Sequence, residues 1–248
     1  MNGVASFSQG ENMQLVDKSV LITGANGGLG LALVEALLKA GAGQIYAACR
    51  DPGRLALDHP RVKALTLDVT DPEQVRQAAV IADIDILVNN AGLNRQQRLL
   101  GTNAPEAAAQ EMAVNYFAML AMIRAFAPVL SERRGAIINV LSILARVALP
   151  AMGSLCASKA AALRLTEAVR AELAGRVQVM AVLPGVIDTA MSRDFPGAKA
   201  SPEAVARAII AGLVTGATEV YPDPMAMGVA EGLKVDRAAV QASFASFD

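Results

Sequence analysis

Short apolar runs alternate with segments of helical periodicity along most of this chain. The first run, residues 20–23, is followed at 29–40 by a helical pattern that stops at Gly41. Strands that alternate with helices form parallel sheets through right-handed crossovers, with helices on both faces. The sequence therefore predicts an α/β fold built on a single doubly wound parallel sheet. Further strands are expected at 44–48, 62–67, 84–88, 136–140, 178–183 and 219–221, and further helices at 71–79, from 105 to about 130, at 155–173 and from 201 onward.

The length and hydrophobic content indicate one domain with a large core. The chain has 248 residues, and 54% of them are hydrophobic. We expect a flexible tail over residues 1–14 and a single domain over 15–248. Residues 185–200 lack a clear pattern and carry Gly, Pro, Asp and Met, so a mobile substrate loop is expected there.

Charge and composition narrow the expected partners and location. The 22 basic and 23 acidic residues form no like-charge block, so no nucleic-acid partner is expected. We expect no apolar run of membrane-span length, and the N-terminus has no apolar stretch typical of a signal peptide. Two cysteines, Cys49 and Cys156, make no disulfide framework, which favours a cytoplasmic protein. No metal site is expected.

A glycine-rich segment lies between the first predicted strand and the first predicted helix. Gly24 allows a tight turn, Gly28 lets a diphosphate approach the backbone, and Gly30 lets the helix pack close to the strand. The free N–H groups at the start of the helix favour phosphate binding. An ordinary glycine-rich turn is the alternative. Because a strand precedes the segment and a helix follows it, we favour nucleotide binding.

The spacing Thr-Gly-x-x-x-Gly-x-Gly from Thr23 resembles the short-chain dehydrogenase/reductase family, and the resemblance runs from about residue 18 to 221. It implies the Rossmann fold and roles for Asn115 as a structural and proton-relay residue, Ser142 as a ligand of the substrate oxygen, and Lys159 as the active-site lysine. Together with the glycine-rich segment and the end of the second predicted strand, it gives the expected cofactor-binding residues Gly24, Asn26, Gly28, Leu29, Gly30, Arg50, Asp68, Val69, Asn90, Ala91, Gly92, Lys159, Pro184, Gly185 and Thr189.

The end of the second predicted strand indicates which dinucleotide is bound. An acidic residue there would accept hydrogen bonds from a free ribose 2′-OH, but this chain has Cys49 followed by Arg50. An arginine can pair with a 2′-phosphate and stack on adenine. The sequence therefore predicts NADP(H) in preference to NAD(H), although NAD(H) stays possible. The alternative is that Arg50 is a solvated residue beside Asp51.

In the family that this chain resembles, a tyrosine stands four residues before the lysine and exchanges a proton with the substrate oxygen. This chain has Leu155 at that place, four residues before Lys159 and thirteen after Ser142 (155 − 142). The spacing is that of the family, so we interpret Leu155 as a replacement of the tyrosine. Leucine has no proton to give, and the loss of one general acid costs about 10²–10⁴-fold in rate.

No other side chain is expected to supply the missing proton. Cys156 and Ser158 are turned away from that face of the helix, because successive helical residues are about 100° apart. The remaining candidates are expected to lie elsewhere: Tyr46 and Tyr221 on strands, Tyr116 beside Asn115, and His59 in a loop.

The sequence thus predicts an NADP(H)-dependent oxidoreductase that interconverts a carbonyl and an alcohol on a small or medium apolar molecule, with activity impaired or altered at Leu155. Leu155 is a laboratory change, a natural variant that uses water as the proton donor, or a sign of lost catalysis. The alternatives are a catalytically silent dinucleotide-binding protein and a non-redox enzyme such as an isomerase or cyclase. The resemblance also implies a homodimer or tetramer formed through the two long helices.

Overall fold

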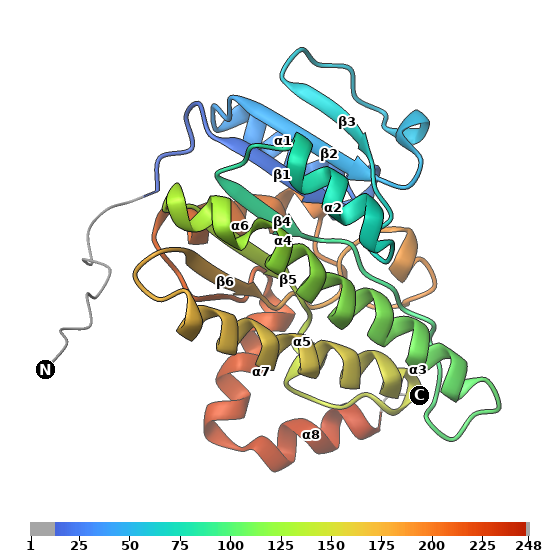
Figure 1. The fold of residues 1–248 in the computed structure, drawn as a ribbon. Coiled ribbons are helices and arrows are strands. Elements are labelled where there is room, and N and C mark those ends of the chain that lie inside the picture. Colours follow the sequence, from blue (N-terminus) through green and yellow to red (C-terminus); the bar gives the residue numbers. More distant parts are fainter. Residues whose placement is uncertain (1–12, 247–248) are drawn as a thin grey trace, which may run out of the picture.

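The computed structural model describes residues 13–246 and contains one seven-stranded sheet in which every paired strand is parallel. The strand order is β3-β2-β1-β4-β5-β6-β7 (Figure 1). The predicted fold class is therefore confirmed. The strands are β1 (Ser19–Thr23), β2 (Gln44–Cys49), β3 (Val62–Thr66), β4 (Ile86–Asn89), β5 (Ala136–Val140), β6 (Gln178–Val182) and β7 (Glu219–Val220).

Helices cover both faces of this sheet. On one face α1 packs against α6, and on the other α2 packs against α4, with α5 alongside. The helices are α1 (Gly28–Lys39), α2 (Pro72–Ile81), α3 (Ala104–Met112), α4 (Met119–Glu132), α5 (Gly153–Glu172), α6 (Pro202–Val214), α7 (Pro224–Val235) and α8 (Arg237–Ala245). The shorter helical segments are η1 (Pro52–Arg54), η2 (Ala113–Ala118), η3 (Ile143–Ala145), η4 (Pro150–Met152) and η5 (Ala190–Ser192).

The alternation of side chains along the central strands creates two cores. In β1, Val20 and Ile22 pack with α1 and α6, whereas Leu21 packs with α4 and α5 on the other face. Side chains of a strand point to opposite faces in turn, so a strand covered on both faces is apolar throughout. This is why the predicted strands appear as continuous apolar runs.

The long predicted helix extends from residue 104 to 132 as α3, η2 and α4, and Pro128 lies inside it. The middle segment η2 is a π-helix. By length and composition this helix could cross a membrane, with a mean hydropathy of 1.6 over its most apolar window. The expectation that no apolar run reaches membrane-span length was therefore wrong, because Arg124 and Pro128 do not interrupt the helix. Its apolar side chains, among them Phe126, contribute to the core on one face of the sheet.

The C-terminal helices α7 and α8 were not predicted. Asp223 caps α7 through Ala226 N–H at 2.9 Å, with Pro224 following, and Asp236 caps α8 in the same manner. Asp followed by Pro is a helix-start signal, and the same pair starts α2 at Asp71. Together with η3 and the start of α5, these helices enclose a further set of apolar side chains, which we call the third apolar cluster. Its buried members are Ile143, Leu144, Val147, Leu155, Cys156, Ala226 and Val229.

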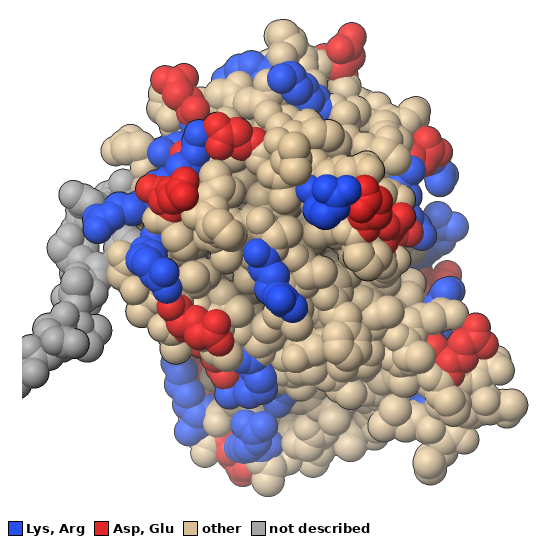
Figure 2. Space-filling view, in the orientation of Figure 1, with Lys and Arg blue, Asp and Glu red and all other residues tan. Residues whose placement is uncertain are grey.

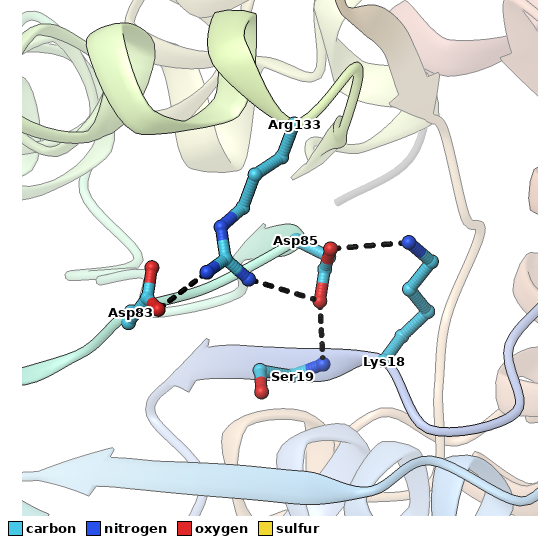
Figure 3. A network of polar contacts seen from close by, with 5 residues as sticks. All are labelled: Lys18, Ser19, Asp83, Asp85 and Arg133. Carbon is cyan, nitrogen blue, oxygen red and sulfur yellow. Dashed lines mark hydrogen bonds and ion pairs between the residues drawn. The ribbon is translucent and has the colours of Figure 1, made fainter.

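A charged network fixes the edge of the sheet where the strands begin (Figure 3). The Asp85 carboxylate accepts a hydrogen bond from Ser19 N–H at 2.9 Å and pairs with the Lys18 ammonium at 3.1 Å. Arg133, which follows α4, lies 3.7 Å from the same carboxylate and also pairs with Asp83. The network joins β1, β4 and α4 at the edge opposite the ends where the predicted site residues lie.

The predicted N-terminal tail falls almost wholly outside the described residues. Residues 1–12 are not part of the described structure, and Met13 packs against the core between the sheet and α1. Predicted element boundaries differ from the observed ones by one or two residues at several ends. The helix that carries Lys159, for example, begins at Gly153 instead of Leu155.

Candidate active site

The predicted site residues meet at the carboxyl edge of the sheet. In a doubly wound fold, ligands bind outside the carboxyl ends of the strands where the strand order reverses, which is here between β1 and β4. Following the strand order from β3 to β6, the residues that follow each strand are Asp68, Arg50, Gly24, Asn90, Ser142 and Gly185.

The glycine-rich turn after β1 is tied to the loop after β4. The Thr23 hydroxyl accepts hydrogen bonds from the backbone N–H groups of Asn90 and Ala91, both at 3.0 Å. The Asn90 side-chain amide donates to the carbonyls of Thr23 and Gly24 at 2.9 and 3.2 Å. Gly24 has a φ of +66°, and a Cβ at Gly30 would lie 2.1 Å from the Gly24 carbonyl oxygen. Both positions therefore require glycine.

The first turn of α1 presents free backbone N–H groups. No side chain caps this helix, and its N-cap residue is Gly27. The side chain of Leu29 is buried in the core, so Leu29 can contribute only its backbone to a ligand. Within residues 13–246 the Asn26 side chain forms no hydrogen bond, and it lies partly exposed beside the turn. An uncapped helix start behind a glycine turn suits a phosphate group.

The carboxyl end of β2 offers a cation where other dinucleotide sites hold an acid. Cys49 is buried, which raises the pKa of its thiol, so it cannot serve as an anionic partner. Arg50 is exposed. The neighbouring Asp51 carboxylate accepts a hydrogen bond from Gly53 N–H at 3.2 Å and caps η1. Among the described residues Arg50 has no ion pair, so its guanidinium is available to an anion.

Asp68 and Val69 lie on the same side of the glycine turn. The Asp68 carboxylate accepts hydrogen bonds from Thr70 N–H and hydroxyl at 2.9 and 2.7 Å, and its backbone N–H donates to Gln74. Val69 lines a small internal cavity with Thr23 and Ala91. The structure therefore brings Val69 next to the β1 and β4 loops, with Asp68 directly before it in the chain.

Lys159 lies at the centre of the candidate site. It is 7% exposed, and its ammonium donates a hydrogen bond to the Val140 carbonyl at 3.0 Å. Burial lowers the pKa of Lys159 from 10.5 to about 8. A Cβ on Gly92 would lie 3.6 Å from the Lys159 Nζ and 3.5 Å from the Asn115 Oδ1. The lysine, Asn115 and the loop after β4 thus surround one small volume.

Asn115 joins that loop to α5. Its Oδ1 accepts a hydrogen bond from Leu93 N–H, and its amide donates to the Leu93 carbonyl and the Ser158 hydroxyl, all at 2.9 Å. Both amide N–H groups are used, so a relay water could not be held by them. Asn115 lies in the π-helix η2, and such segments are frequent at functional sites.

Sequence reasoning missed a buried carboxylate on the same helix. Glu111 is fully buried, and its Oε1 accepts a hydrogen bond from Arg95 N–H at 2.6 Å. Within the described part of the chain, its Oε2 and the buried Ser154 hydroxyl have no hydrogen-bond partner. The available signal was an acidic residue four places before Asn115, which puts it about one helical turn away on the same face. Glu111 holds the loop that follows Gly92.

Ser142 caps the start of η3, and the residues that follow it in η3 pack against Leu155. The Ser142 oxygen accepts a hydrogen bond from Leu144 N–H at 3.1 Å, so its own O–H stays available to a ligand. Leu155 is 7% exposed and packs in the third apolar cluster with Ile143 and Leu144. The residue that resembles the tyrosine position is therefore part of an apolar surface.

None of the three tyrosines compensates for Leu155 in this structure. Tyr221 follows β7 instead of lying on it, and it packs against the third apolar cluster. Its hydroxyl donates to the Glu219 carboxylate at 2.9 Å, and burial together with Glu219 raises its pKa. Tyr116 contacts Phe117 edge to face, and Tyr46 lies under Lys63.

The segment after β6 closes the site. The Pro184 carbonyl accepts a hydrogen bond from Ile143 N–H at 2.9 Å, and Gly185 N–H donates to the Asp223 carboxylate at 2.8 Å. A Cβ on Gly28 would lie 3.0 Å from the Thr189 methyl group. The predicted residues of this segment therefore face the Ser142 loop at one end and the glycine turn at the other.

Comparison with known proteins decides the family. The family model described as short chain dehydrogenase matches residues 18–199. The chain belongs to the short chain dehydrogenase family. The family assignment suggested by the sequence motifs is therefore confirmed, and this short chain dehydrogenase is an oxidoreductase by descent.

Relatives of this short chain dehydrogenase include curated proteins and a solved structure. It is 35% identical over 219 residues to the 1-deoxy-11-beta-hydroxypentalenate dehydrogenase of Streptomyces exfoliatus, covering 82% of this chain and 80% of that protein. It is 37% identical over 191 residues to the short chain dehydrogenase pigC of Monascus ruber, covering 69% of this chain and 63% of that protein. A short chain dehydrogenase from Burkholderia cenocepacia, solved in complex with NADP, is 53% identical with a TM-score of 0.90 and covers 94% of this chain and 99% of that one.

Proposed function

We propose that this protein is an NADP(H)-dependent oxidoreductase that interconverts a carbonyl and an alcohol on a small or medium apolar molecule. One observation carries the proposal. The buried Lys159 ammonium lies beside Gly92 and Asn115, at the sheet edge where the uncapped glycine turn before α1 is found. A cation and a phosphate-binding turn at one edge suit a dinucleotide that spans them.

The chemistry of the residues fits NADP(H). The exposed Arg50 has no carboxylate partner in the described structure, because Asp51 is engaged with Gly53. A guanidinium in this place favours a ribose 2′-phosphate over a free hydroxyl. The Burkholderia cenocepacia relative was solved with NADP, which supports the same choice.

Different residues of the site bind the substrate oxygen and supply the proton. When bound, the nicotinamide ring supplies or accepts the hydride. Ser142 donates its O–H to the substrate oxygen, because its own oxygen is already held by Leu144 N–H. With a pKa of about 8, Lys159 is mostly charged at neutral pH, and it can return a proton to a water molecule between itself and Ser142. Leu155 donates nothing, so that water is the proton donor to the alkoxide.

The surroundings favour an apolar substrate and a self-associating protein. Leu155 and its neighbours in the third apolar cluster, Ile143 and Leu144, put hydrocarbon close to Ser142 in the chain. Phe117 is 58% exposed on η2, and only 39% of the most apolar stretch of that long helix is buried. Figure 2 shows a broad surface over α4 and α5 with few charged side chains. Such a face favours the dimer or tetramer that we propose, since large exposed apolar patches mark interfaces.

The proposal is tested by measuring NADPH oxidation with a panel of ketones and aldehydes, together with NADPH and NADH binding by calorimetry. We expect tighter binding of NADPH than of NADH, and slow but measurable oxidation. Tight binding with no turnover on any carbonyl would contradict the oxidoreductase. Product formed without a change in NADPH absorbance would indicate a non-redox enzyme such as an isomerase or cyclase.

Leu155 favours a second candidate, a catalytically silent dinucleotide-binding protein. A site that has lost its proton donor and gained an apolar side chain can keep cofactor binding alone. Leu155→Tyr separates the two candidates. Carbonyl reduction that stays absent in this variant, despite unchanged NADPH affinity, supports the silent protein.

A further inference from the structure

The segment predicted as a substrate loop is a closed and internally bonded structure. At its base, Ala200 N–H donates to the Val186 carbonyl at 2.8 Å, and Asp188 N–H donates to the Ala200 carbonyl at 2.9 Å. Inside the loop, Thr189 N–H donates to the Ser192 hydroxyl at 3.4 Å, and Ser192 N–H donates to the Thr189 carbonyl at 3.1 Å. These hydrogen bonds join the two ends of the loop to each other and shape η5 within it.

This loop borders an open cavity of about 430 Å³ that carries two cations. The Lys199 ammonium is largely buried, donates to the Arg193 carbonyl at 3.1 Å and lies 3.8 Å from the Asp188 carboxylate. The Arg193 side chain is exposed, and within residues 13–246 its guanidinium has neither a hydrogen bond nor an ion pair. The cavity is lined by Asp188, Thr189, Ala190, Arg193 and Lys199.

The cavity adjoins the phosphate-binding turn. Its lining residue Thr189 has a methyl group 3.0 Å from the position of a Cβ on Gly28. Gly28 is the first residue of α1, whose N–H groups no side chain caps. Arg193 and Thr189 therefore line one cavity, and Thr189 joins that cavity to the start of α1. A group that extended from the cavity to the helix start would meet positive charge at both.

We propose that the loop from Asp188 to Lys199 is a cationic clamp on the diphosphate of the dinucleotide, in which Arg193 pairs with the phosphate oxygens. This inference rests on the proposed function. Arginine donates two parallel hydrogen bonds to phosphate, which suits the role. Lys199 is a positioning residue, since its hydrogen bond to the Arg193 carbonyl fixes the backbone position of that arginine. An anionic group of the substrate is the competing ligand, but the contact with Gly28 favours the diphosphate.

The test measures dissociation constants of NADPH, NADH and ADP-ribose by calorimetry for the wild type and Arg193→Ala. ADP-ribose keeps the diphosphate but lacks the nicotinamide and the 2′-phosphate. We expect Arg193→Ala to weaken all three ligands about tenfold, as for the loss of a charge-assisted hydrogen bond. Arg50→Ala is expected to weaken NADPH alone. Arg207→Ala, at an exposed arginine of α6, is the matched control and should change none.

Lys199 is tested by two substitutions. Lys199→Gln is expected to weaken ADP-ribose binding by a smaller factor than Arg193→Ala, and Lys199→Arg should restore it, because an arginine can still donate to the Arg193 carbonyl. A Lys199→Gln variant that binds as the wild type does would remove Lys199 from the clamp.

The outcomes separate this inference from the proposed function. Unchanged dinucleotide and ADP-ribose affinities in Arg193→Ala would overturn the clamp while leaving the oxidoreductase intact. If Arg193→Ala raises the KM only of carbonyl substrates that carry a carboxylate, and not of neutral ones, the cavity binds the substrate and not the diphosphate. If the wild type binds neither NADPH nor ADP-ribose, the proposed function itself fails.

Discussion

Lys159→Met is expected to stabilise the protein when no cofactor is bound. The lysine is 7% exposed, and burial lowers its pKa from 10.5 to about 8. At roughly 1.4 kcal/mol per pH unit, keeping the charged form buried costs about 3 kcal/mol of folding free energy. Methionine removes that cost but leaves the Val140 carbonyl without its partner, which costs about 1 kcal/mol. The net gain at pH 7 is therefore about 2 kcal/mol.

The stability gained in Lys159→Met depends on pH, because the pKa of Lys159 differs between the folded and unfolded states. Because the folded pKa is lower than the unfolded one, the unfolded chain binds more protons between pH 8 and 10.5. The full penalty of Lys159 is present below pH 8, and it disappears as the pH rises to 10.5. The advantage of Lys159→Met should therefore be greatest at pH 7 and shrink across this range.

Thermal unfolding of both proteins from pH 7 to 10.5 checks the prediction. A gain of about 2 kcal/mol raises Tm by about 4–8 °C for a chain of this size. Lys234→Met, at a lysine whose side chain is 69% exposed, is the matched control and should show no such pattern. A difference in Tm that is absent at pH 7, or constant between pH 8 and 10.5, would refute the argument that burial sets the charge of Lys159. Saturating NADPH should raise Tm less in Lys159→Met than in the wild type.

Three further substitutions test other parts of the structure. Leu155→Tyr is expected to raise carbonyl reduction by about 10²–10⁴-fold in steady-state assays, whereas Leu155→Phe, with the same ring and no hydroxyl, should not. Asp85→Asn breaks the network between β1, β4 and α4 and should lower the unfolding free energy in urea by about 2 kcal/mol, less in high salt. Gly30→Ala forces a Cβ against the Gly24 carbonyl and should cost about 2 kcal/mol of stability and weaken NADPH binding; an unaffected variant would show that the turn can widen.

The motifs and the order of elements could be predicted from sequence because each depends on neighbouring residues. The apolar runs and helical periodicities identified the seven strands and most helices, and the intervals from Gly24 to Lys159 indicated the family. The interpretation of Leu155 as a replacement of the family's tyrosine rests on the same resemblance and spacing, and it stays a prediction. A parallel sheet then places every residue that follows a strand at one edge, so much of the candidate site followed from topology.

Other features depend on contacts between distant parts of the chain. No local pattern shows that Asn115 uses both amide N–H groups on Leu93 and Ser158, or that Glu111 is fully buried. The helices α7 and α8 had capping signals, but their position against Leu155 is decided by packing.

The sequence by itself determined the fold class, the family and the identity of the groups available for chemistry, because periodicity and spacing are properties of the chain alone. Only the tertiary structure decided that Lys159 is buried enough to lower its pKa, and that Arg193 lines a cavity with Thr189, which lies against Gly28. Desolvation and charge–charge proximity arise between residues far apart in sequence, and they exist only once the sheet, its helices and its loops have packed together.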